Sequence, residues 1–184
     1  MTPCIVIVDD DAAVRSSLAS VLSTYGYETR TFASAREAIG GLAEGPCDCI
    51  LLDVRMPDLD GLSALKLMQS SGPTPPVIMI TGHGDVPMAV QAMKLGAVDF
   101  IEKPVMDEAL VQSIGSVLER SKRETEEETL SREVRERYAT LTAREQDVAA
   151  LVVEGYSSAA IATTLNISVR TVDHHRASIL AKMR

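Results

Sequence analysis

Short apolar runs recur along the first two thirds of the chain at intervals too long for hairpins. Their first residues lie 21 to 28 positions apart, which leaves room for a helix between consecutive strands. Several runs are continuously apolar, as in strands that are covered on both faces. The expected strands are residues 5–8, 28–32, 49–52, 77–80 and 98–101. Because apolar residues between these runs follow a helical period, the pattern predicts an α/β fold, a (βα)5 unit with a parallel sheet.

A change of composition follows this unit. Residues 121–137 contain 5 basic and 6 acidic side chains among 17, and Leu130 and Val134 are the large apolar ones. Glutamates precede arginines by four positions at 128–132 and 133–137, a spacing that stabilises a helix. We therefore expect a linker helix over 121–137, with a disordered hinge as the alternative.

The last part of the chain, residues 138–184, has the pattern of short helices. Thr142 is followed three positions later by Glu145, which is typical of a capping box. Gly155 is expected to end that helix, and Ser168 to cap a final helix that begins at residue 169. These signals predict a small all-α domain.

Composition excludes one class of function and indicates the cellular compartment. Apolar residues make up 46% of the chain, Trp is absent, and there are only 4 Tyr and 2 Phe, so a single-strand binder that stacks bases is excluded. The apolar runs are too short to cross a membrane, there is no secretory signal, and three cysteines fit reduced thiols, so we expect a cytoplasmic protein.

Charge is distributed unevenly along the chain. Residues 1–120 hold 8 basic against 16 acidic side chains, whereas residues 121–184 hold 10 of each. In the last 16 residues, Arg170, Arg176, Lys182 and Arg184 oppose Asp173 alone. This local positive charge favours binding to double-stranded DNA despite the net charge of −8.

Polar residues gather where the expected strands end. Asp9, Asp10 and Asp11 follow the first strand, and Asp53 follows the third. Thr81 follows the fourth strand, and Lys103 comes shortly after the fifth. In an open parallel sheet these positions converge at one edge. Clustered carboxylates suit Mg2+, and a carboxylate can attack phosphorus to give an aspartyl phosphate whose oxygens a hydroxyl and a lysine could hold.

Residues 1–120 resemble a response-regulator receiver domain, which has a flavodoxin-like fold. The matching pieces are residues 5–11, Leu52-Asp53-Val54-Arg55-Met56-Pro57, Asp60-Gly61 and Lys103-Pro104, and the stretch Thr81-Gly82-His83-Gly84-Asp85-Val86-Pro87 is similar to the FixJ-like branch. The resemblance implies phosphorylation of Asp53 by a sensor histidine kinase. It further implies Mg2+ (or Mn2+) held by Asp9, Asp10, Asp53 and the backbone carbonyl of Arg55, phosphoryl contacts from Thr81 and Lys103, Phe100 as the switch aromatic, and a cis Lys103–Pro104 bond.

Two other functions compete with this interpretation. An Asp-x-Asp after an apolar strand also resembles phosphatases of the haloacid dehalogenase type, but Ala12-Ala13 follows where those enzymes usually have a polar or small branched pair. A receiver that has lost its chemistry and serves only as a binding module is the second alternative. The complete set of acids, Thr81 and Lys103 argues against it.

Residues 138–184 resemble the LuxR/NarL-type helix-turn-helix domain. The similarity lies in Leu141-Thr142-Ala143-Arg144-Glu145, Gly155-Tyr156-Ser157, Leu165-Asn166-Ile167-Ser168 and Arg170-Thr171-Val172. It implies that the final helix lies in the major groove, with Asp173, His174 and Ala177 facing base edges and Arg170, Thr171 and Arg176 near the backbone or the groove wall. The family usually continues past Lys182-Met183 into a fourth helix, so we expect a domain that lacks the usual last helix.

Together the two resemblances imply a regulator of transcription rather than an enzyme acting on other molecules, since the only catalysis would be its own phosphoryl transfer and dephosphorylation. Phosphorylation would favour a homodimer, formed around residues 88–100, that binds a two-fold symmetric DNA site. The expected organisation is a receiver domain over 1–120, a linker helix over 121–137 and a DNA-binding domain over 138–184.

Overall fold

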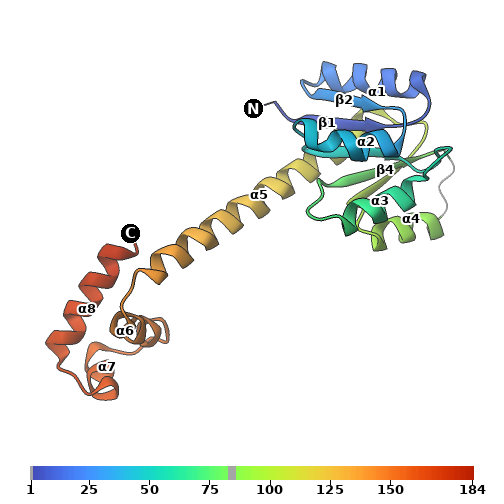
Figure 1. The fold of residues 1–184 in the computed structure, drawn as a ribbon. Coiled ribbons are helices and arrows are strands. Elements are labelled where there is room, and N and C mark those ends of the chain that lie inside the picture. Colours follow the sequence, from blue (N-terminus) through green and yellow to red (C-terminus); the bar gives the residue numbers. More distant parts are fainter. Residues whose placement is uncertain (1, 83–85) are drawn as a thin grey trace. The chain divides into compact units, whose positions relative to one another are not determined.

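The computed structural model describes residues 2–82 and 86–184, which divide into two compact units, Met1–Lys122 and Arg123–Arg184. Strands and helices alternate in the first unit, and helices alone make up the second (Figure 1). The strands are β1 (Cys4–Val8), β2 (Glu28–Phe32), β3 (Cys49–Asp53), β4 (Val77–Thr81) and β5 (Asp99–Glu102). The helices are α1 (Ala12–Thr24), α2 (Ala35–Gly41), the 3-10 turn η1 (Leu42–Glu44), α3 (Gly61–Ser70), α4 (Val86–Lys94), α5 (Asp107–Ala139), α6 (Ala143–Val153), α7 (Ser158–Leu165) and α8 (Val169–Lys182).

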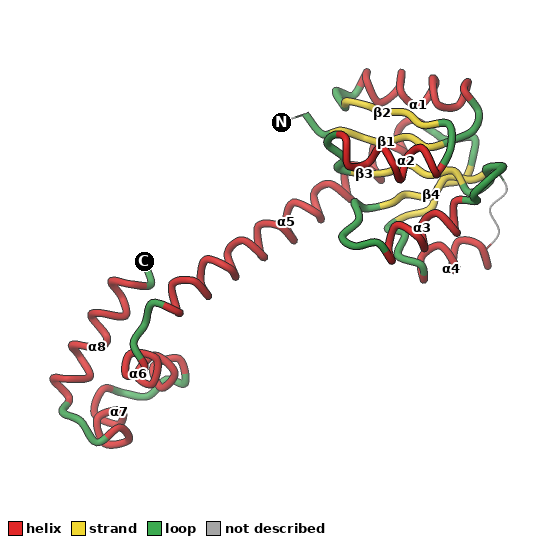
Figure 2. Tube along the Cα trace, in the orientation of Figure 1, coloured by secondary structure: helices red, strands yellow, loops and turns green. Residues whose placement is uncertain are grey.

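All five strands pair in parallel, in the order β2-β1-β3-β4-β5 (Figure 2). Helices α2, α3 and α4 pack on one face of this sheet, and α1 and α5 on the other. The predicted α/β fold with a parallel sheet is therefore confirmed.

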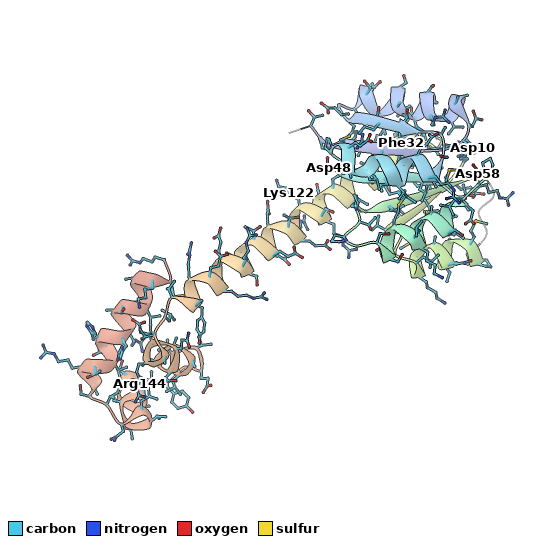
Figure 3. The ribbon with its side chains drawn as sticks, in the orientation of Figure 1. Asp10, Phe32, Asp48, Asp58, Lys122 and Arg144 are labelled. Atoms are coloured by element: carbon cyan, nitrogen blue, oxygen red, sulfur yellow. The ribbon has the colours of Figure 1, made fainter. Side chains whose placement is uncertain are left out.

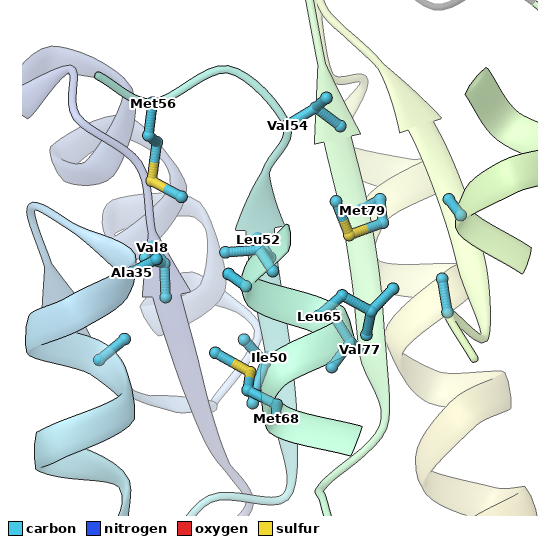
Figure 4. Packing of buried hydrophobic residues seen from close by; sticks show 14 of the residues in the cluster. Val8, Ala35, Ile50, Leu52, Val54, Met56, Leu65, Met68, Val77 and Met79 are labelled. Atoms are coloured by element: carbon cyan, nitrogen blue, oxygen red, sulfur yellow. The ribbon is translucent and has the colours of Figure 1, made fainter. Parts of the chain in front are cut away.

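Successive residues of a strand pack on opposite faces of the sheet, because their side chains point to opposite sides. Ile50 and Leu52 of β3 pack with Leu65 and Met68 of α3, as the close view of this layer shows (Figure 4). Leu51, between them, belongs to the opposite cluster with α1 and α5. This double coverage explains why β1 and the first four residues of β3 and of β4 are continuously apolar in sequence.

The strand ends differ slightly from the sequence prediction. Asp53 and Thr81 are the last residues of their strands rather than the residues that follow, and β5 runs one position later than predicted. The reason is that strand pairing depends on backbone hydrogen bonds and not on side-chain polarity. Asp53 pairs with Ile80, and Glu102 pairs with Thr81.

Aspartate side chains cap two helices of the first unit. The side chain of Asp11 caps α1 by accepting a hydrogen bond from the backbone N–H of Ala13 at 2.8 Å. Asp60 caps α3 in the same way through Ser63. Residues 121–137 lie within α5, which runs from Asp107 to Ala139.

The second unit consists of α6, α7 and α8 with the end of α5. Thr142 and Glu145 form the predicted capping box, Ser168 caps α8, and Gly155 follows the end of α6 with a φ of +88°. The core contains Val148 of α6 and Val172 of α8 together with residues of α7. Within the described residues, no helix is long and apolar enough to cross a membrane.

Candidate functional site

The polar residues that were expected to converge lie at the carboxyl edge of the sheet. Asp9 follows β1, Asp53 ends β3, Thr81 ends β4, and Lys103 follows β5. In the order β2-β1-β3-β4-β5 the connections reverse direction between β1 and β3. Open α/β sheets bind ligands at such a switch point, because the loops from the two strands diverge there and leave a crevice.

Lys103 joins the two buried carboxylates of this edge. Its Nζ atom lies 2.6 Å from Asp9 Oδ2 and 2.6 Å from Asp53 Oδ1. Both aspartates are nearly inaccessible, with exposed fractions of 2% and 4%. A shared cation is what allows two buried carboxylates to remain ionised close together.

Backbone groups occupy the other oxygens of these carboxylates. Asp9 Oδ1 accepts a hydrogen bond from the N–H of Asp11 at 2.9 Å, and Asp53 Oδ2 accepts one from the N–H of Arg55 at 2.6 Å. The guanidinium of Arg15, on α1, also donates to the backbone carbonyl of Asp9 at 2.6 Å. Backbone N–H groups thus hold both carboxylates, and Arg15, which the sequence did not single out, holds the backbone of Asp9.

The ion pair and burial act in opposite directions on the site's pKa values. Burial raises the pKa of Asp53, and the nearby Asp9 adds to this effect, while Lys103 opposes it. For Lys103, burial disfavours the charged form, but hydrogen bonds and attraction to Asp53 and Asp9 outweigh it and raise its pKa. Lys103 therefore carries its positive charge at neutral pH.

The remaining members of the predicted metal set lie around this pair. Asp10 is exposed on the loop after β1, at the same end of the sheet as Asp58 (Figure 3). Arg55 is exposed on the loop after β3. Among residues 2–82 and 86–184, no three His, Cys, Asp or Glu side chains are gathered closely enough to hold a metal ion.

The predicted switch residues, Thr81 and Phe100, lie on β4 and β5. Thr81 is fully buried, and its backbone carbonyl accepts a hydrogen bond from the N–H of Lys103 at 2.7 Å. Phe100 is half-buried and packs against the core of the α2–α4 face. The Lys103–Pro104 bond is cis, as the resemblance implied. His83, Gly84 and Asp85 of the FixJ-like stretch lie outside the described residues.

Gly61 is a structural member of the site whose role the sequence did not reveal. It begins α3 directly behind β3, and its N–H donates to the carbonyl of Val54 at 2.9 Å. A Cβ atom at Gly61 would lie 2.2 Å from the backbone oxygen of Asp53. Only a residue without a side chain allows α3 to approach β3 this closely. The Asp60-Gly61 pair was visible as a motif, but the contact with Asp53 was not.

Helix α8 presents most of the predicted DNA-contacting residues to solvent. The exposed ones are Arg170, Thr171, Asp173, His174 and Ala177. Thr171 also takes part in the helix cap, since its N–H and hydroxyl both contact Ser168 Oγ. Arg176 is half-buried and lines an apolar groove with Ile179. Because Arg176 is three positions after the exposed Asp173, it lies at the border between the exposed residues and the packed face of α8.

Comparisons with known proteins agree with this architecture. Residues 5–115 match the family described as response regulator receiver domain, and residues 139–184 match the family described as bacterial regulatory proteins, luxR family. These matches decide between the receiver and the haloacid dehalogenase alternative in favour of the receiver.

Curated relatives and solved structures extend the similarity over almost the whole chain. The transcriptional regulatory protein FixJ of Bradyrhizobium diazoefficiens is 40% identical over 98% of this chain and 88% of its own length. The response regulator protein TodT of Pseudomonas putida is 39% identical over 98% of this chain and 79% of its own. The structure of the response regulator StyR has a TM-score of 0.81 at 33% identity, and covers 100% of this chain and 92% of its own.

Full-length FixJ from B. japonicum has a TM-score of 0.68 at 39% identity, over 100% of this chain and 91% of that one. Both halves of the chain are thus matched by family and by fold. The chain belongs to the two-component response regulators in which a receiver domain is joined to a LuxR-type DNA-binding domain.

Proposed function

We propose that Asp53 accepts a phosphoryl group from a sensor histidine kinase and that the phosphorylated protein dimerises and binds DNA to regulate transcription. The observation that carries this proposal is the contact of one ammonium group, that of Lys103, with the buried carboxylates of Asp9 and Asp53. It argues against the alternative of a receiver that has lost its chemistry, because such a domain has no need to bury two carboxylates.

The proposed chemical step is a transfer from nitrogen to oxygen. A carboxylate oxygen of Asp53 forms a bond to phosphorus while the phosphorus–nitrogen bond of the kinase's phosphohistidine breaks, and the electron pair stays with the imidazole. Lys103 and the hydroxyl of Thr81 then stabilise the phosphoryl oxygens. Lys103 is already positioned by Asp53, so it needs little movement to follow the negative charge from the carboxylate to the phosphoryl group.

The donor set suits a hard divalent cation. Asp9 and Asp53 supply two buried carboxylates that already share one positive group, and Asp10 and the carbonyl of Arg55 lie on the adjoining loops. We propose these four residues as ligands of Mg2+ (or Mn2+). The metal would neutralise charge on the phosphoryl oxygens during transfer. Because Lys103 lies between Asp9 and Asp53, part of its contact must be released when a metal binds.

The α4 and β5 region is the proposed dimer surface. Val90 and Met93 of α4 are exposed apolar side chains, and Val86 at the start of α4 is 77% exposed. Thr81 ends the strand next to β5, which carries Phe100, so a change at the phosphorylated site has a short route to this surface. Dimerisation would then present two DNA-binding domains to a two-fold symmetric site.

The proposed reading element is α8, with Asp173, His174 and Ala177 at base edges and Arg170, Thr171 and Arg176 near the phosphate backbone. Its support is the exposure of five of these six residues on a helix that is capped by the preceding turn. The proposed boundaries of the parts are 1–120, 121–137 and 138–184. Since bacterial DNA lies in the cytoplasm, we propose that the protein acts there.

The test is mass measurement after incubation with a small phosphodonor and Mg2+. Wild-type protein should gain one phosphoryl group, and Asp53→Asn should gain none. Asp11→Asn is the matched control: it changes a neighbouring acid to an amide that can still cap α1, and it should be labelled like wild type. Equal labelling of wild type and Asp53→Asn would rule out the proposed chemistry.

A further inference from the structure

Glu145 is a buried carboxylate with more partners than helix capping requires. It is 4% exposed, and it is the N3 residue of the capping box at the start of α6. Oε2 accepts hydrogen bonds from the N–H of Thr142 at 2.7 Å and from its hydroxyl at 3.0 Å. The first of these, together with the bond from the N–H of Glu145 to Thr142 Oγ1 at 3.3 Å, makes the capping box, which needs only one oxygen of the carboxylate.

The other partners belong to α8. The hydroxyl of Ser178 donates to Glu145 Oε1 at 2.6 Å, and the ammonium of Lys182 donates to Oε2 at 2.7 Å. Ser178 and Lys182 are four positions apart, so they lie on the same face of the helix. One carboxylate therefore connects the start of α6 to the second half of α8.

Further contacts hold the end of α8 in the same place. Lys182 Nζ also lies 3.4 Å from the carbonyl oxygen of Thr140, and Arg137 Nη1 lies 3.4 Å from the carbonyl oxygen of Met183. The ammonium of Lys182 thus has two acceptors of its own chain, Thr140 O and Glu145 Oε2, although the side chain also reaches solvent. If it turned toward a DNA phosphate, Glu145 would remain buried without a cation, which is strongly unfavourable.

We propose that Glu145, Ser178 and Lys182 form a clasp that positions α8 for DNA binding, and that Lys182 is a structural cation and not a phosphate contact. This inference rests on the proposed reading of DNA by α8. It divides the positive charges at the end of the chain into two kinds. The side chains of Arg170 and Lys182 are both exposed to solvent, but the ammonium of Lys182 lies 2.7 Å from Glu145 Oε2 and is held there.

Salt dependence separates the two kinds of charge. The full chain is titrated with a random-sequence duplex, and the binding constant is followed against NaCl concentration by fluorescence anisotropy. The variant Glu145→Gln/Lys182→Met removes both members of the ion pair and leaves the net charge unchanged. We expect it to bind more weakly at each salt concentration but with the wild-type slope. The matched variant Arg170→Met should reduce the slope by about 0.9, the value for one phosphate contact.

Each outcome bears on the proposal. A slope reduced by about 0.9 in the double variant would make Lys182 a phosphate contact and overturn the inference. Unchanged slope and unchanged affinity would mean that the clasp does not position α8, which also overturns it. If Arg170→Met and Arg176→Met both leave the slope at the wild-type value, α8 does not contact phosphates and the proposed reading function itself fails.

Two further measurements do not depend on whether the double variant folds. Ser178→Ala removes one hydrogen bond and no charge, and it should weaken binding without changing the slope. Lys66 and Lys182 are both exposed, but the ion pair with Glu145 should make Lys182 of wild type without DNA react more slowly with an acetylating amine reagent than Lys66, and Glu145→Gln should remove that protection. Equal rates for Lys182 and Lys66 in wild type would show that the clasp is not formed.

Discussion

The ammonium group of Lys103 and the carboxylate of Asp53 are 2.6 Å apart, although 50 positions of sequence separate the two residues. The lysine also holds Asp9 at the same distance. Lys103 thus occupies the position between the two carboxylates where a divalent cation would be attracted. If the proposed function holds, the lysine that assists the phosphorylated state would at the same time compete with the metal in the resting state.

We therefore expect Lys103→Met to bind Mg2+ more tightly than wild type. Removing one positive charge close to the carboxylates favours a second cation by on the order of tenfold or more. Isothermal titration of Mg2+ into the protein measures the change. Lys66→Met, which removes an exposed lysine of α3, is the control and should have wild-type affinity. Weaker binding in Lys103→Met would mean that the lysine supports the metal site.

Gly61→Ala should destabilise the receiver unit. The added Cβ would lie 2.2 Å from the backbone oxygen of Asp53, so α3 must move away from β3. Such overpacking costs about 1–3 kcal/mol or more. Urea unfolding followed by circular dichroism measures the loss. Gly40→Ala adds the same methyl group in α2, where nothing lies within 4 Å, and should leave stability unchanged or increase it.

Thr81→Ala should separate phosphorylation from activation. Asp53 remains intact, so a small phosphodonor should still label the variant. Moving the ratio of active to inactive conformers from about 1:99 to 99:1 needs about 5.5 kcal/mol of differential stabilisation. Loss of the hydroxyl contact to the phosphoryl group should therefore leave part of the phosphorylated protein in the inactive conformer. Sedimentation of the phosphorylated variant should show less dimer than wild type. A full dimer would refute the role of Thr81.

Acid should weaken the second unit through Glu145. Hydrogen bonds from Lys182 and Ser178 lower the pKa of this carboxyl from about 4.5 to about 2. A carboxyl with a lowered folded-state pKa contributes stability above its unfolded pKa and loses it as pH falls, here between about 4.5 and 2. The difference in melting temperature between wild type and Glu145→Gln should shrink over this range. Glu154→Gln, an exposed change on the same unit, is the control.

His174→Ala and Arg176→Ala should differ in what they change. Base contacts select sequence, whereas phosphate contacts add affinity for every duplex. We expect His174→Ala to cost about 1–3 kcal/mol on the preferred site and little elsewhere. Arg176→Ala should weaken binding to all duplexes alike. Selection of preferred sites from a random pool, followed by binding to preferred and scrambled duplexes, distinguishes the two. Equal behaviour on both duplexes would contradict the role assigned to His174.

Local sequence determined where most elements begin and what they bury. Thr142 and Ser168 cap the helices that they were predicted to cap, because an N-cap needs only a side-chain acceptor and the next few N–H groups. The apolar runs identified β1, β3 and β4 for a similar reason, since coverage on both faces favours apolar side chains at nearly every position. The sequence did not decide the conformation of residues 121–137, because a charged stretch with so few apolar residues is compatible with both a solvated helix and a disordered hinge.

Tertiary structure alone decided which distant groups meet. Nothing near Lys103 in sequence shows that one nitrogen contacts two carboxylates, 94 and 50 positions away. The same holds for Gly61, whose missing side chain matters only because α3 packs against β3. Glu145 was identified from sequence as a cap, but its bonds to Ser178 and Lys182, 33 and 37 positions later, exist only when α8 packs on α6. Capping and burial follow local chemistry and periodicity, whereas charge pairing between remote segments depends on how the elements pack.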